Sequence, residues 1–538
     1  MAFNGIDTLG LSEILEDDRS AALTALLISA AHEDKTGHTL RQIYQEISNL
    51  GLSHLLDPLD VIPALVPVGN EAARDILALA GECSSAKEVV VAVQESVERV
   101  EAMLSAGSDE DDAETDARRS PASQLDVLIS LYTASIPRMK LRKKSASDTI
   151  SPLMTDLEAT VRLLSSRTAP DEGRALVDIV CSAVEAIHKW VISLDGTPED
   201  ALKCKNILHT VLESTVLACL PFINASLAQQ AFAISSPRIA SRIPVKPGKE
   251  ESESAVRSAM RTTQLLGFDV PALSPNADLI TLVYLAHSPS VLPFSPSRLE
   301  TLLPILVTSI MTNVALDETL AILLYQLNGP SDIPLEVLAA LANVIPSLAS
   351  AHPDPSIRMM TFRLLAQLLA RAPQQIHLDI LRELTSESEF PQMRSAAIGL
   401  VREAVLDGLS KPMGQNIFAS PQFMKTFAPI LFKLNPPNLL APGLSPEEFI
   451  ETSEPSRISE SLGLLYVLLL RDKHNQTGIR AREAINNIEV DLLAPLRAFL
   501  DSQKSGSHEG DSHNHDDMSF ASLEMNLERV YSVLPTLQ

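Results

Sequence analysis

The residues of this chain best suited to metal chemistry gather in one short stretch near its C-terminal end. Residues 502–517 (SQKSGSHEGDSHNHDD) mix imidazoles with carboxylates, namely His508, His513 and His515 with Asp511, Asp516 and Asp517. Such a mixture binds Zn or Ni loosely. A structural metal site needs fixed tetrahedral geometry and supporting hydrogen bonds, which a Gly/Ser-rich stretch does not supply. We therefore predict no bound metal and no cofactor.

The sequence contains none of the short motifs that mark common catalytic sites. There is no GxxxxGK[ST] phosphate-binding loop, no GxSxG nucleophile elbow, no HExxH zinc motif and no GxGxxG dinucleotide loop. Gly248-Lys249 lacks both the upstream glycine and the following hydroxyl residue of a phosphate-binding loop. Acidic residues are scattered as on solvated helix faces, whereas acid–base catalysis needs a buried carboxylate. We predict that the chain is not an enzyme.

Composition narrows the fold and the class of partner. The 538 residues exceed the roughly 250–300 at which one hydrophobic core stops growing, so we expect several domains or a linear array of repeats. Aromatic residues make up only 4%, which argues against β-sandwiches and barrels. With 43 Lys and Arg against 68 Asp and Glu, the net charge is −25, and binding to nucleic acid is not expected.

Cysteine content and apolar runs predict the compartment. The four cysteines form no CxxC pair, as expected of reduced thiols in the cytosol or nucleus. The N-terminal residues show no basic leader followed by an apolar run. The longest apolar stretch, 462–470, is interrupted by Gly463 and is too short to cross a membrane. We expect a cytoplasmic protein, with the nucleus as a second location, and no membrane contact.

A basic segment precedes two serines in the N-terminal half. Residues 139–147 read MKLRKKSAS, so that Arg142, Lys143 and Lys144 stand directly before Ser145 and Ser147. This pattern suits a phosphorylation site or a weak nuclear-import signal, because an added phosphate would find cations nearby. The plainer interpretation is a solvated turn. The sequence does not decide which of the two serines would be modified.

The elements that position these residues are predicted to be helices. The chain has 35 prolines, one in about every 15 residues, which matches a short helix plus its turn. Between the prolines, apolar residues recur at helical spacing, as in 297–306 (SRLETLLPIL). Alternating patterns are almost absent, and the best strand candidate, 89–93, also fits a helix. The pattern predicts an all-α fold in which the single tryptophan, Trp190, faces the core.

Two segments 36 residues apart resemble each other. Pro355-Ser-Ile-Arg358 and Pro391-Gln-Met-Arg394 each open a helical pattern with apolar residues at matching positions. A proline at the first helical position costs nothing, because its missing N–H would have no partner within the helix. An arginine one turn further resembles the second helix of a HEAT-type repeat. We predict a HEAT/ARM-like α-solenoid of degenerate helical hairpins, the alternative being a chance match within a helical bundle.

Composition also suggests how the chain divides. An acidic stretch, a proline-rich stretch and a low-complexity stretch interrupt the helical patterns. The predicted parts are an N-terminal helical-repeat half (1–235) with a disordered acidic loop at about 107–121, a linker (236–254), a C-terminal helical-repeat half that binds a partner (255–501), a low-complexity loop (502–517) and a terminal helix (518–538).

Arginines stand out on the two repeat helices of this acidic chain. They are Arg358, Arg363, Arg371, Arg394 and Arg402. Because arginine is often an anchor of protein interfaces, Arg358, Arg363, Arg394 and Arg402 are candidate partner-binding residues. The alternative is that Arg358 and Arg394 pair with carboxylates between repeats.

A polar turn follows the apolar stretch and reads Arg471-Asp-Lys-His-Asn-Gln-Thr-Gly478. Gly478 suits the left-handed residue just after a helix, and Arg471 and Lys473 are favourable at a helix C-terminus. The alternative role is direct contact with a partner, which makes Arg471, Lys473, Asn475 and Gln476 candidate partner-binding residues as well.

The C-terminal region resembles a known family. Residues 464–479 (LLYVLLLRDKHNQTGI), followed by 485–489 (INNIE) and 492–496 (LLAPL), are similar to glomulin and to the YAP-binding proteins of its family. Residues 351–365 (AHPDPSIRMMTFRLL) resemble the repeat helix of the same family. The resemblance is strongest over about 350–500.

The resemblance implies a HEAT-like, non-catalytic binding protein, which we expect to be a monomer. Glomulin-like members bind the RING-box subunit of cullin-RING ubiquitin ligases through their C-terminal half and mask the surface that receives the ubiquitin-conjugating enzyme. Fungal relatives are instead partners of a bZIP transcription factor in the oxidative-stress response, and one is associated with kinetochores. The resemblance alone leaves these branches open.

Overall fold

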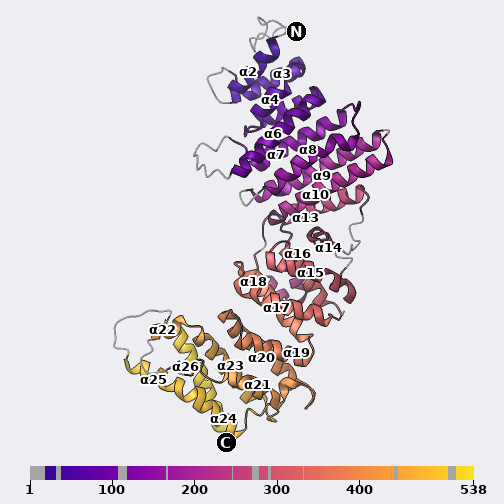
Figure 1. The fold of residues 1–538 in the computed structure, drawn as a ribbon. Helices are drawn as coiled ribbons and strands as arrows, with labels where there is room; N and C mark the ends of the chain where they lie inside the picture. The colour runs from indigo at the N-terminus through magenta and orange to yellow at the C-terminus, as the bar shows by residue number, and fades with distance from the viewer. Residues whose placement is uncertain are drawn as a thin grey trace. The chain divides into compact units, whose positions relative to one another are not determined.

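The computed structural model of the chain consists of helices joined by turns (Figure 1). It describes residues 18–31, 38–106, 118–164, 168–194, 196–244, 246–268, 278–288, 292–330, 332–437, 439–440, 446–506 and 516–537. Among these residues no strand forms, and the one β-type contact is an isolated antiparallel bridge between Val68 and Arg118. The predicted all-α solenoid of helical hairpins is therefore confirmed.

The chain forms two compact units. Unit 1 comprises Met1–Pro293 and Pro304–Tyr325, and unit 2 comprises Phe294–Leu303 and Gln326–Gln538. Two helices contribute residues to both units, α15 (Pro296–Thr312) and α16 (Leu316–Asn328).

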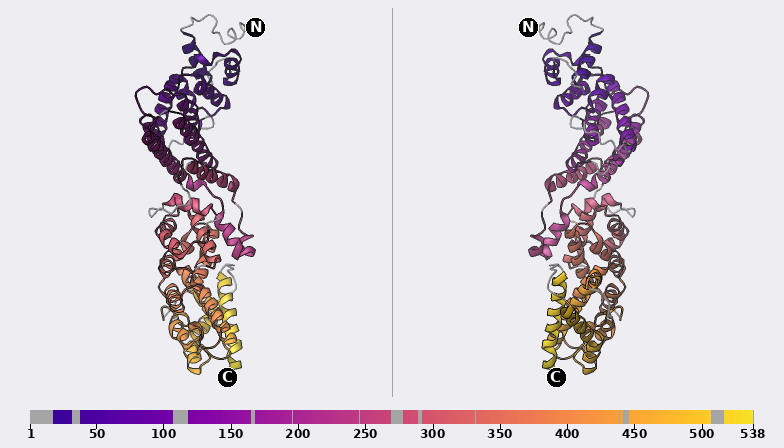
Figure 2. Two further views of the ribbon diagram at one scale, coloured as in Figure 1. Left: turned by 90° about the vertical axis from the view of Figure 1, so that its right-hand side faces the viewer. Right: turned by 90° about the vertical axis from the view of Figure 1, so that its left-hand side faces the viewer.

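Unit 1 is a stack of helices in two layers (Figures 1 and 2). Its remaining helices are α2 (Arg19–Ala31), α3 (Leu40–Leu50), α4 (Pro58–Leu65), α5 (Glu71–Cys83), α6 (Ala86–Ala106), α7 (Pro121–Ser135), α8 (Ala146–Arg162), α9 (Pro170–Ser193), α10 (Pro198–Cys219), α11 (Leu227–Ser235), α12 (Pro237–Ala240), α13 (Lys249–Leu265) and α14 (Leu279–Ala286). Helices α4, α6, α8 and α10 pack in sequence along one layer, and α3, α5, α7, α9 and α13 along the other. From α2 to α8 each helix thus contacts the helix two places further on, as expected of stacked repeats, whereas α9 contacts α13.

The helix boundaries of unit 1 follow from local sequence. Prolines at the first helical position open α7, α9 and α10. Ser120 caps α7 by accepting from the Ser123 N–H, and Thr197 caps α10 by accepting from the Asp200 N–H. Trp190, near the end of α9, is 5% exposed, which confirms its predicted place in the core.

Unit 2 contains the predicted repeat. Its helices are α17 (Leu335–Ala351), α18 (Pro355–Ala370), α19 (Gln374–Ser386), α20 (Pro391–Ser410), α21 (Pro421–Leu431), α22 (Pro446–Glu451), α23 (Glu454–Arg471), α24 (Arg482–Ile488), α25 (Ala494–Gly506) and α26 (Asp516–Val533). Helix α18 packs on α17, and α20 packs on α19. The two Pro-x-x-Arg helices are therefore the second helices of consecutive hairpins. Helix α20 also packs on α23, which packs on α26.

The stretches predicted to interrupt the helices have more structure than composition indicates. Residues 236–254 contain α12 and the start of α13, which begins after the left-handed Gly248 and carries Glu250 and Glu251 in its first turn. Ser252 is fully buried there, because its hydroxyl donates to the Gly248 carbonyl and accepts from the Asn224 N–H. The composition of a segment does not report such contacts.

The other two predicted loops lie partly outside the described residues. Of the acidic stretch at about 107–121, residues 107–117 are outside them, and α7 already begins at Pro121. Of the stretch 502–517, residues 507–515 are outside them, including all three histidines of the predicted loose metal cluster. Helix α25 reaches Gly506 and α26 begins at Asp516, two residues before the predicted terminal helix.

No single helix in the described part of the chain combines the length and apolar character needed to span a membrane. One bent pair, Pro198–Phe222 with Leu227–Ser235, meets these criteria jointly with a bend of 62°.

Candidate interaction surface

Arg358 and Arg394 occupy equivalent positions and make equivalent contacts. The Arg358 guanidinium donates to the His352 carbonyl at 2.6 Å and to the Pro353 carbonyl at 3.0 Å. Arg394 Nε donates to the Ser388 carbonyl at 2.7 Å. In both cases the acceptor lies six residues earlier, in the turn that enters the helix. The hydrogen bonds of these two side chains therefore go to their own turns, and among the described residues neither pairs with a carboxylate of another repeat.

Arg363 and Arg402 instead join neighbouring helices through exposed ion pairs. Arg363 on α18 lies 3.5 Å from Glu403 on α20, and Arg402 on α20 lies 3.6 Å from Glu460 on α23. The side chains of Arg363 and Arg402 remain 43% and 39% exposed. Ion pairs this exposed contribute roughly 0–1 kcal/mol. Little free energy is thus lost if a partner's carboxylate replaces the intramolecular one.

Arg402 and Glu460 border a groove on unit 2 with a volume of about 690 Å³. One wall comes from α20 (Pro391, Gln392, Ser395, Ala396, Gly399, Arg402), and the other from Phe362 on α18 and from Glu451, Thr452, Ser453, Ser456 and Glu460 on α22 and α23. A Cβ built on Gly399 meets no heavy atom within 4 Å, so this wall faces open space. The groove is open, its lining includes several small residues such as Ser395, Ala396 and Gly399, and Arg402 and Glu460 give it opposite charges. Such a shape suits contact with a protein surface better than enclosure of a small molecule.

The polar turn after α23 is organised by a buried aspartate. Asp472 is 0% exposed, and its carboxylate accepts from the Gln476 N–H at 2.7 Å and from the Thr477 N–H at 2.8 Å. It also accepts from the Thr477 hydroxyl at 2.7 Å. Asn475, in a left-handed conformation, accepts from the Arg480 N–H through its side chain. The motif thus has a structural role.

The structure places the candidate residues of this turn differently from one another. Arg471 and Lys473 are exposed, whereas Gln476 is half-buried, and its side-chain oxygen accepts no hydrogen bond from the described residues. Gly478 has a φ of +86° but follows α23 by seven positions, so the predicted C′ role is wrong and the helix ends at Asp472 instead. Sequence analysis missed Asp472; the available signal was an aspartate followed by several short polar residues, which is typical of side-chain-to-backbone turns.

A second hollow of unit 2, of about 370 Å³, lies between α18, α19 and α20 and includes His377. Burial lowers the pKa of His377 to about 4, against a smaller opposing effect of Asp407. The ring packs edge-on against Phe418, with centroids 4.9 Å apart. His377 is therefore neutral at pH 7 and fills space, which does not favour acid catalysis here.

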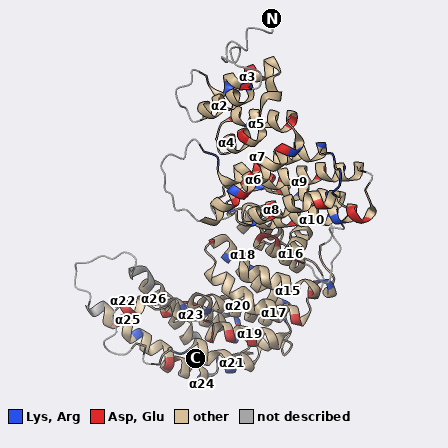
Figure 3. Cartoon of the chain, turned by 45° about the horizontal axis from the view of Figure 1, so that its top comes forward, with Lys and Arg blue, Asp and Glu red and all other residues tan. Residues whose placement is uncertain are grey.

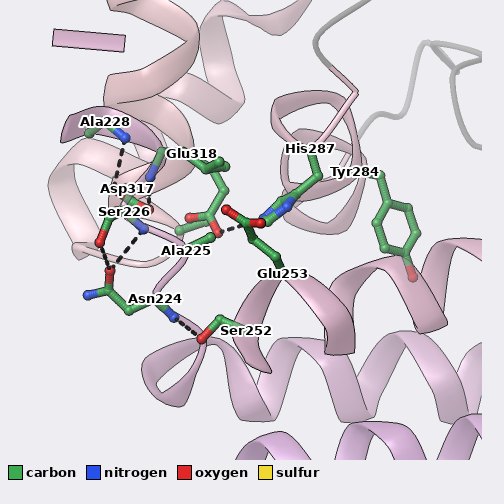
Figure 4. Close-up of polar contacts among 12 residues, drawn as sticks. Asn224, Ala225, Ser226, Ala228, Ser252, Glu253, Tyr284, His287, Asp317 and Glu318 are labelled. Atoms are coloured by element: carbon green, nitrogen blue, oxygen red, sulfur yellow. Dashed lines mark hydrogen bonds and ion pairs between the residues drawn. The ribbon is translucent and has the colours of Figure 1, made fainter. Parts of the chain in front are cut away.

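Among the described residues of unit 1, buried and half-buried ionisable side chains converge around the start of α16 (Figure 4). Asp317 and Glu318 begin α16, and His287 follows α14. His287 Nε2 lies 3.7 Å from Glu318 Oε1, and neither atom forms a hydrogen bond with a described residue. Glu253 of α13 lies beside His287 in the close-up. Next to them a hollow of about 400 Å³ is lined in part by Glu253, Arg257 and His287.

Asp317 serves as the N-terminal cap of a helix far away in sequence. Its carboxylate accepts from the Leu227 N–H at 2.8 Å and from the Ala228 N–H at 3.0 Å, at the start of α11. Ser226, the residue before α11, has a φ of +53° and makes no capping bond of its own. Burial, and after it the neighbouring Glu318, raise the pKa of Asp317 to about 6, against the opposing effect of the two N–H groups and His287. Both Asp317 oxygens are engaged by backbone, so this cluster has the contacts of a structural element.

Asp200 makes the same kind of cap elsewhere in unit 1. From the first turn of α10 it accepts from the Ala146 N–H at 3.0 Å and the Ser147 N–H at 3.1 Å, at the start of α8, and from the Ser147 hydroxyl. Desolvation raises the pKa of Asp200, but the hydrogen bonds from Ser147, Ser145 and Ala146 outweigh it, so that the pKa lies below its usual value.

Metal ligands and surface charge add no competing site. Within the described residues no group of three or more His, Cys, Asp or Glu side chains is arranged to hold a metal ion. Figure 3 shows basic and acidic residues interspersed along the helices in this view.

Comparison with known proteins bears on unit 2. Residues 294–526 match the model of a family described as "Uncharacterised protein family, YAP/Alf4/glomulin". Residues 294–526 are thus similar to the YAP/Alf4/glomulin family. The match confirms the resemblance seen in the sequence, and it includes both repeat helices, the groove and the polar turn. A search of curated proteins finds no significant match.

Proposed function

We propose that this chain is a non-enzymatic, glomulin-like scaffold that binds the RING-box subunit of cullin-RING ubiquitin ligases and blocks access of the ubiquitin-conjugating enzyme. The observation that carries the proposal is the YAP/Alf4/glomulin match over 294–526. A protein-binding adaptor role follows from this family. The choice of the RING-box subunit is the finer step, and it rests on the glomulin-like motifs of the C-terminal half.

We further propose the groove between α20 and α23 as the contact face. Its exposed ion pairs can exchange their partners at little cost, and Ala396 and Gly399 let another backbone approach closely. Arg402 and Arg363 would then be anchors at the rim, since arginine is enriched at interface hot spots. Arg358 and Arg394 would hold the helices in place from within. Arg471 and Lys473 are exposed and would extend the contact at the end of α23.

A capture experiment with purified RING-box protein tests the proposal. At micromolar concentrations of both partners we expect the full chain to bind. Ala396→Trp fills the groove and should abolish capture, whereas Ala339→Trp makes the same change at an exposed position of α17 outside the groove and should leave capture unchanged. Failure of the unsubstituted chain to bind rejects the RING-box assignment. Equal binding by both variants rejects the groove.

The second candidate partner is a bZIP transcription factor of the oxidative-stress response, because the family description names YAP as well as glomulin. A role as a kinetochore-associated adaptor belongs to the same alternative. Loss of the protein would then sensitise cells to peroxide while the levels of cullin-ligase substrates stay unchanged. Stabilised or depleted substrates with normal peroxide tolerance would favour the RING-box assignment. Either function places the protein in the cytoplasm or nucleus.

A further inference from the structure

The basic segment before α8 is an exposed, irregular stretch of backbone. After the short 3-10 helix Ile136–Arg138, residues 139–145 belong to no helix. Lys140, Arg142, Lys143 and Lys144 are all exposed, and none of their side chains bonds to a described residue. A segment of this kind can enter the active site of a protein kinase, which binds its substrate in an extended conformation and reads basic residues with carboxylates.

The structure distinguishes the two serines that follow. Ser147 is 8% exposed, and its hydroxyl donates to the Asp200 carboxylate, so it is not accessible. Ser145 is half-buried at the N-cap of α8, three positions after Arg142, and its hydroxyl accepts from the Asp148 N–H at 3.1 Å. Its hydroxyl also contacts the Ser147 hydroxyl at 3.1 Å and the Asp200 carboxylate, yet Ser145 stays more exposed than Ser147.

We propose that Ser145 is the phosphate acceptor for a kinase that selects basic residues upstream, and that its phosphorylation releases Asp200 from the start of α8. In the transfer, Ser145 Oγ forms a bond to the γ-phosphorus of ATP while the bond from that phosphorus to the β–γ bridging oxygen breaks. ADP leaves, and the hydroxyl proton passes to the base of the kinase.

Release of Asp200 follows from the competition of two anions for one helix N-terminus. The Asp200 carboxylate already accepts hydrogen bonds from the N–H groups of Ala146 and Ser147. A phosphate on Ser145 carries a charge of about −1.5 to −2 at pH 7, and it would lie beside that carboxylate while facing the same positive end of the helix. The phosphate is covalently tethered and has the cations of 140–144 nearby, whereas Asp200 is partly exposed and can turn to water. Helices α8 and α10 would then lose the polar bond that joins their ends.

The acceptor is tested on the full chain with the catalytic subunit of cyclic-AMP-dependent protein kinase and labelled ATP. We expect one phosphoryl group per chain, loss of that label in Ser145→Ala, and retention of it in Ser147→Ala. Arg142→Ala should lower the rate of labelling severalfold. Circular dichroism establishes that each variant is folded. Equal labelling of Ser145→Ala, or no labelling of the unsubstituted chain, overturns the assignment.

Release of Asp200 is tested with a second variant, Asp200→Asn, in which the competing charge is absent. Phosphorylation should lower the urea midpoint of the unsubstituted chain and leave that of Asp200→Asn unchanged or raised, because the phosphate then caps α8 without a rival. The same decrease in both proteins overturns the proposed competition. None of these readouts depends on binding of the RING-box subunit, so this inference and the proposed function can fail separately.

Discussion

Asp200 and Asp317 each cap the N-terminus of a helix that is distant in sequence, but their surroundings differ. Each carboxylate accepts from two successive backbone N–H groups at the start of a helix that belongs to another hairpin, α8 for Asp200 and α11 for Asp317. Asp200 is half-buried and gains a third bond from the Ser147 hydroxyl. Asp317 is half-buried as well, but it is more strongly desolvated, lies beside the buried Glu318 and has His287 close by.

The two pKa values move in opposite directions because the surroundings differ while the capping bonds are alike. Extra hydrogen bonds hold the pKa of Asp200 below its usual value, whereas burial and the neighbouring Glu318 raise that of Asp317 to about 6. The same cap is therefore indifferent to mild acid at one site and sensitive to it at the other. The geometry of a hydrogen bond does not by itself fix how it responds to pH.

The largest effect is expected from Asp317→Ala. The substitution leaves the N–H groups of Leu227 and Ala228 without a partner in a region that water enters poorly. We expect a loss of about 2–4 kcal/mol in the free energy of unfolding, since each buried unpaired donor costs roughly 1–3 kcal/mol and relief of the repulsion by Glu318 offsets part of this. Urea denaturation followed by circular dichroism measures it. A loss below that of Asp200→Ala would contradict the role assigned to burial.

The next effect is a pH dependence carried by Asp317. Its pKa is raised in the folded state, so the folded state binds the proton more tightly; this contribution to stability is complete below the unfolded pKa of about 3.9 and is lost as pH rises through about 6. Between pH 7 and pH 5 the contribution should therefore grow by on the order of 1 kcal/mol. Asp200, with its lowered pKa, contributes above its unfolded pKa and is unchanged over this interval.

His188 and His377 have lowered pKa values, so they destabilise the folded state as pH falls and oppose the effect of Asp317. Comparing variants separates the two effects, because every variant keeps both histidines. When the pH is lowered from 7 to 5, the free energy of unfolding of Asp317→Asn should lack the gain of about 1 kcal/mol that Asp317 provides in the unsubstituted chain. Asp200→Asn should follow the unsubstituted chain. If the two asparagine variants gave the same difference, the contrast between the sites would be wrong.

Asp200→Ala is expected to cost about 1 kcal/mol, the typical value for a helix cap. The loss is smaller than at Asp317 because the first turn of α8 borders solvent, which can bond to the N–H groups of Ala146 and Ser147. Ser145 also still caps the Asp148 N–H. The measurement is the same urea denaturation at pH 7, with the Asp317→Ala protein alongside.

The smallest effect concerns the serines at the two helix starts. Ser226 makes no capping bond to α11, so Ser226→Ala should change the free energy of unfolding by less than about 0.5 kcal/mol. Ser145 does cap α8, and Ser145→Ala should cost more, up to about 1 kcal/mol. Equal losses in the two variants would contradict the conclusion that Ser145 caps its helix and Ser226 does not.

Local pattern was sufficient to predict two helices of unit 2, α18 and α20. A proline followed three residues later by an arginine, twice at the same spacing, predicted α18 and α20 and their equivalence, because helix starts depend on neighbouring residues. The same pattern did not reveal what Arg358 and Arg394 bind. Their acceptors are backbone carbonyls, which every residue has, so side-chain types alone cannot identify them.

Contacts between residues far apart in the chain could not be predicted from the sequence. Asp317 and Leu227 are 90 residues apart, and nothing in either segment indicates the other. The groove was likewise not predicted, since it depends on the distance between α20 and α23. Arg363 and Arg402 were named as candidates from their residue type, and the structure places Arg402 on the groove and Arg363 in the next ion pair along.

The arginine contacts of α18 and α20 bear on how a chain of this kind can change in length. Each arginine binds the turn just before its own helix, so the contact that fixes this turn lies within one continuous segment of the chain. Duplicating or deleting such a segment keeps the arginine together with the carbonyl groups that it binds. Relatives of different length should therefore differ by whole hairpins, with the remaining ones keeping their shape.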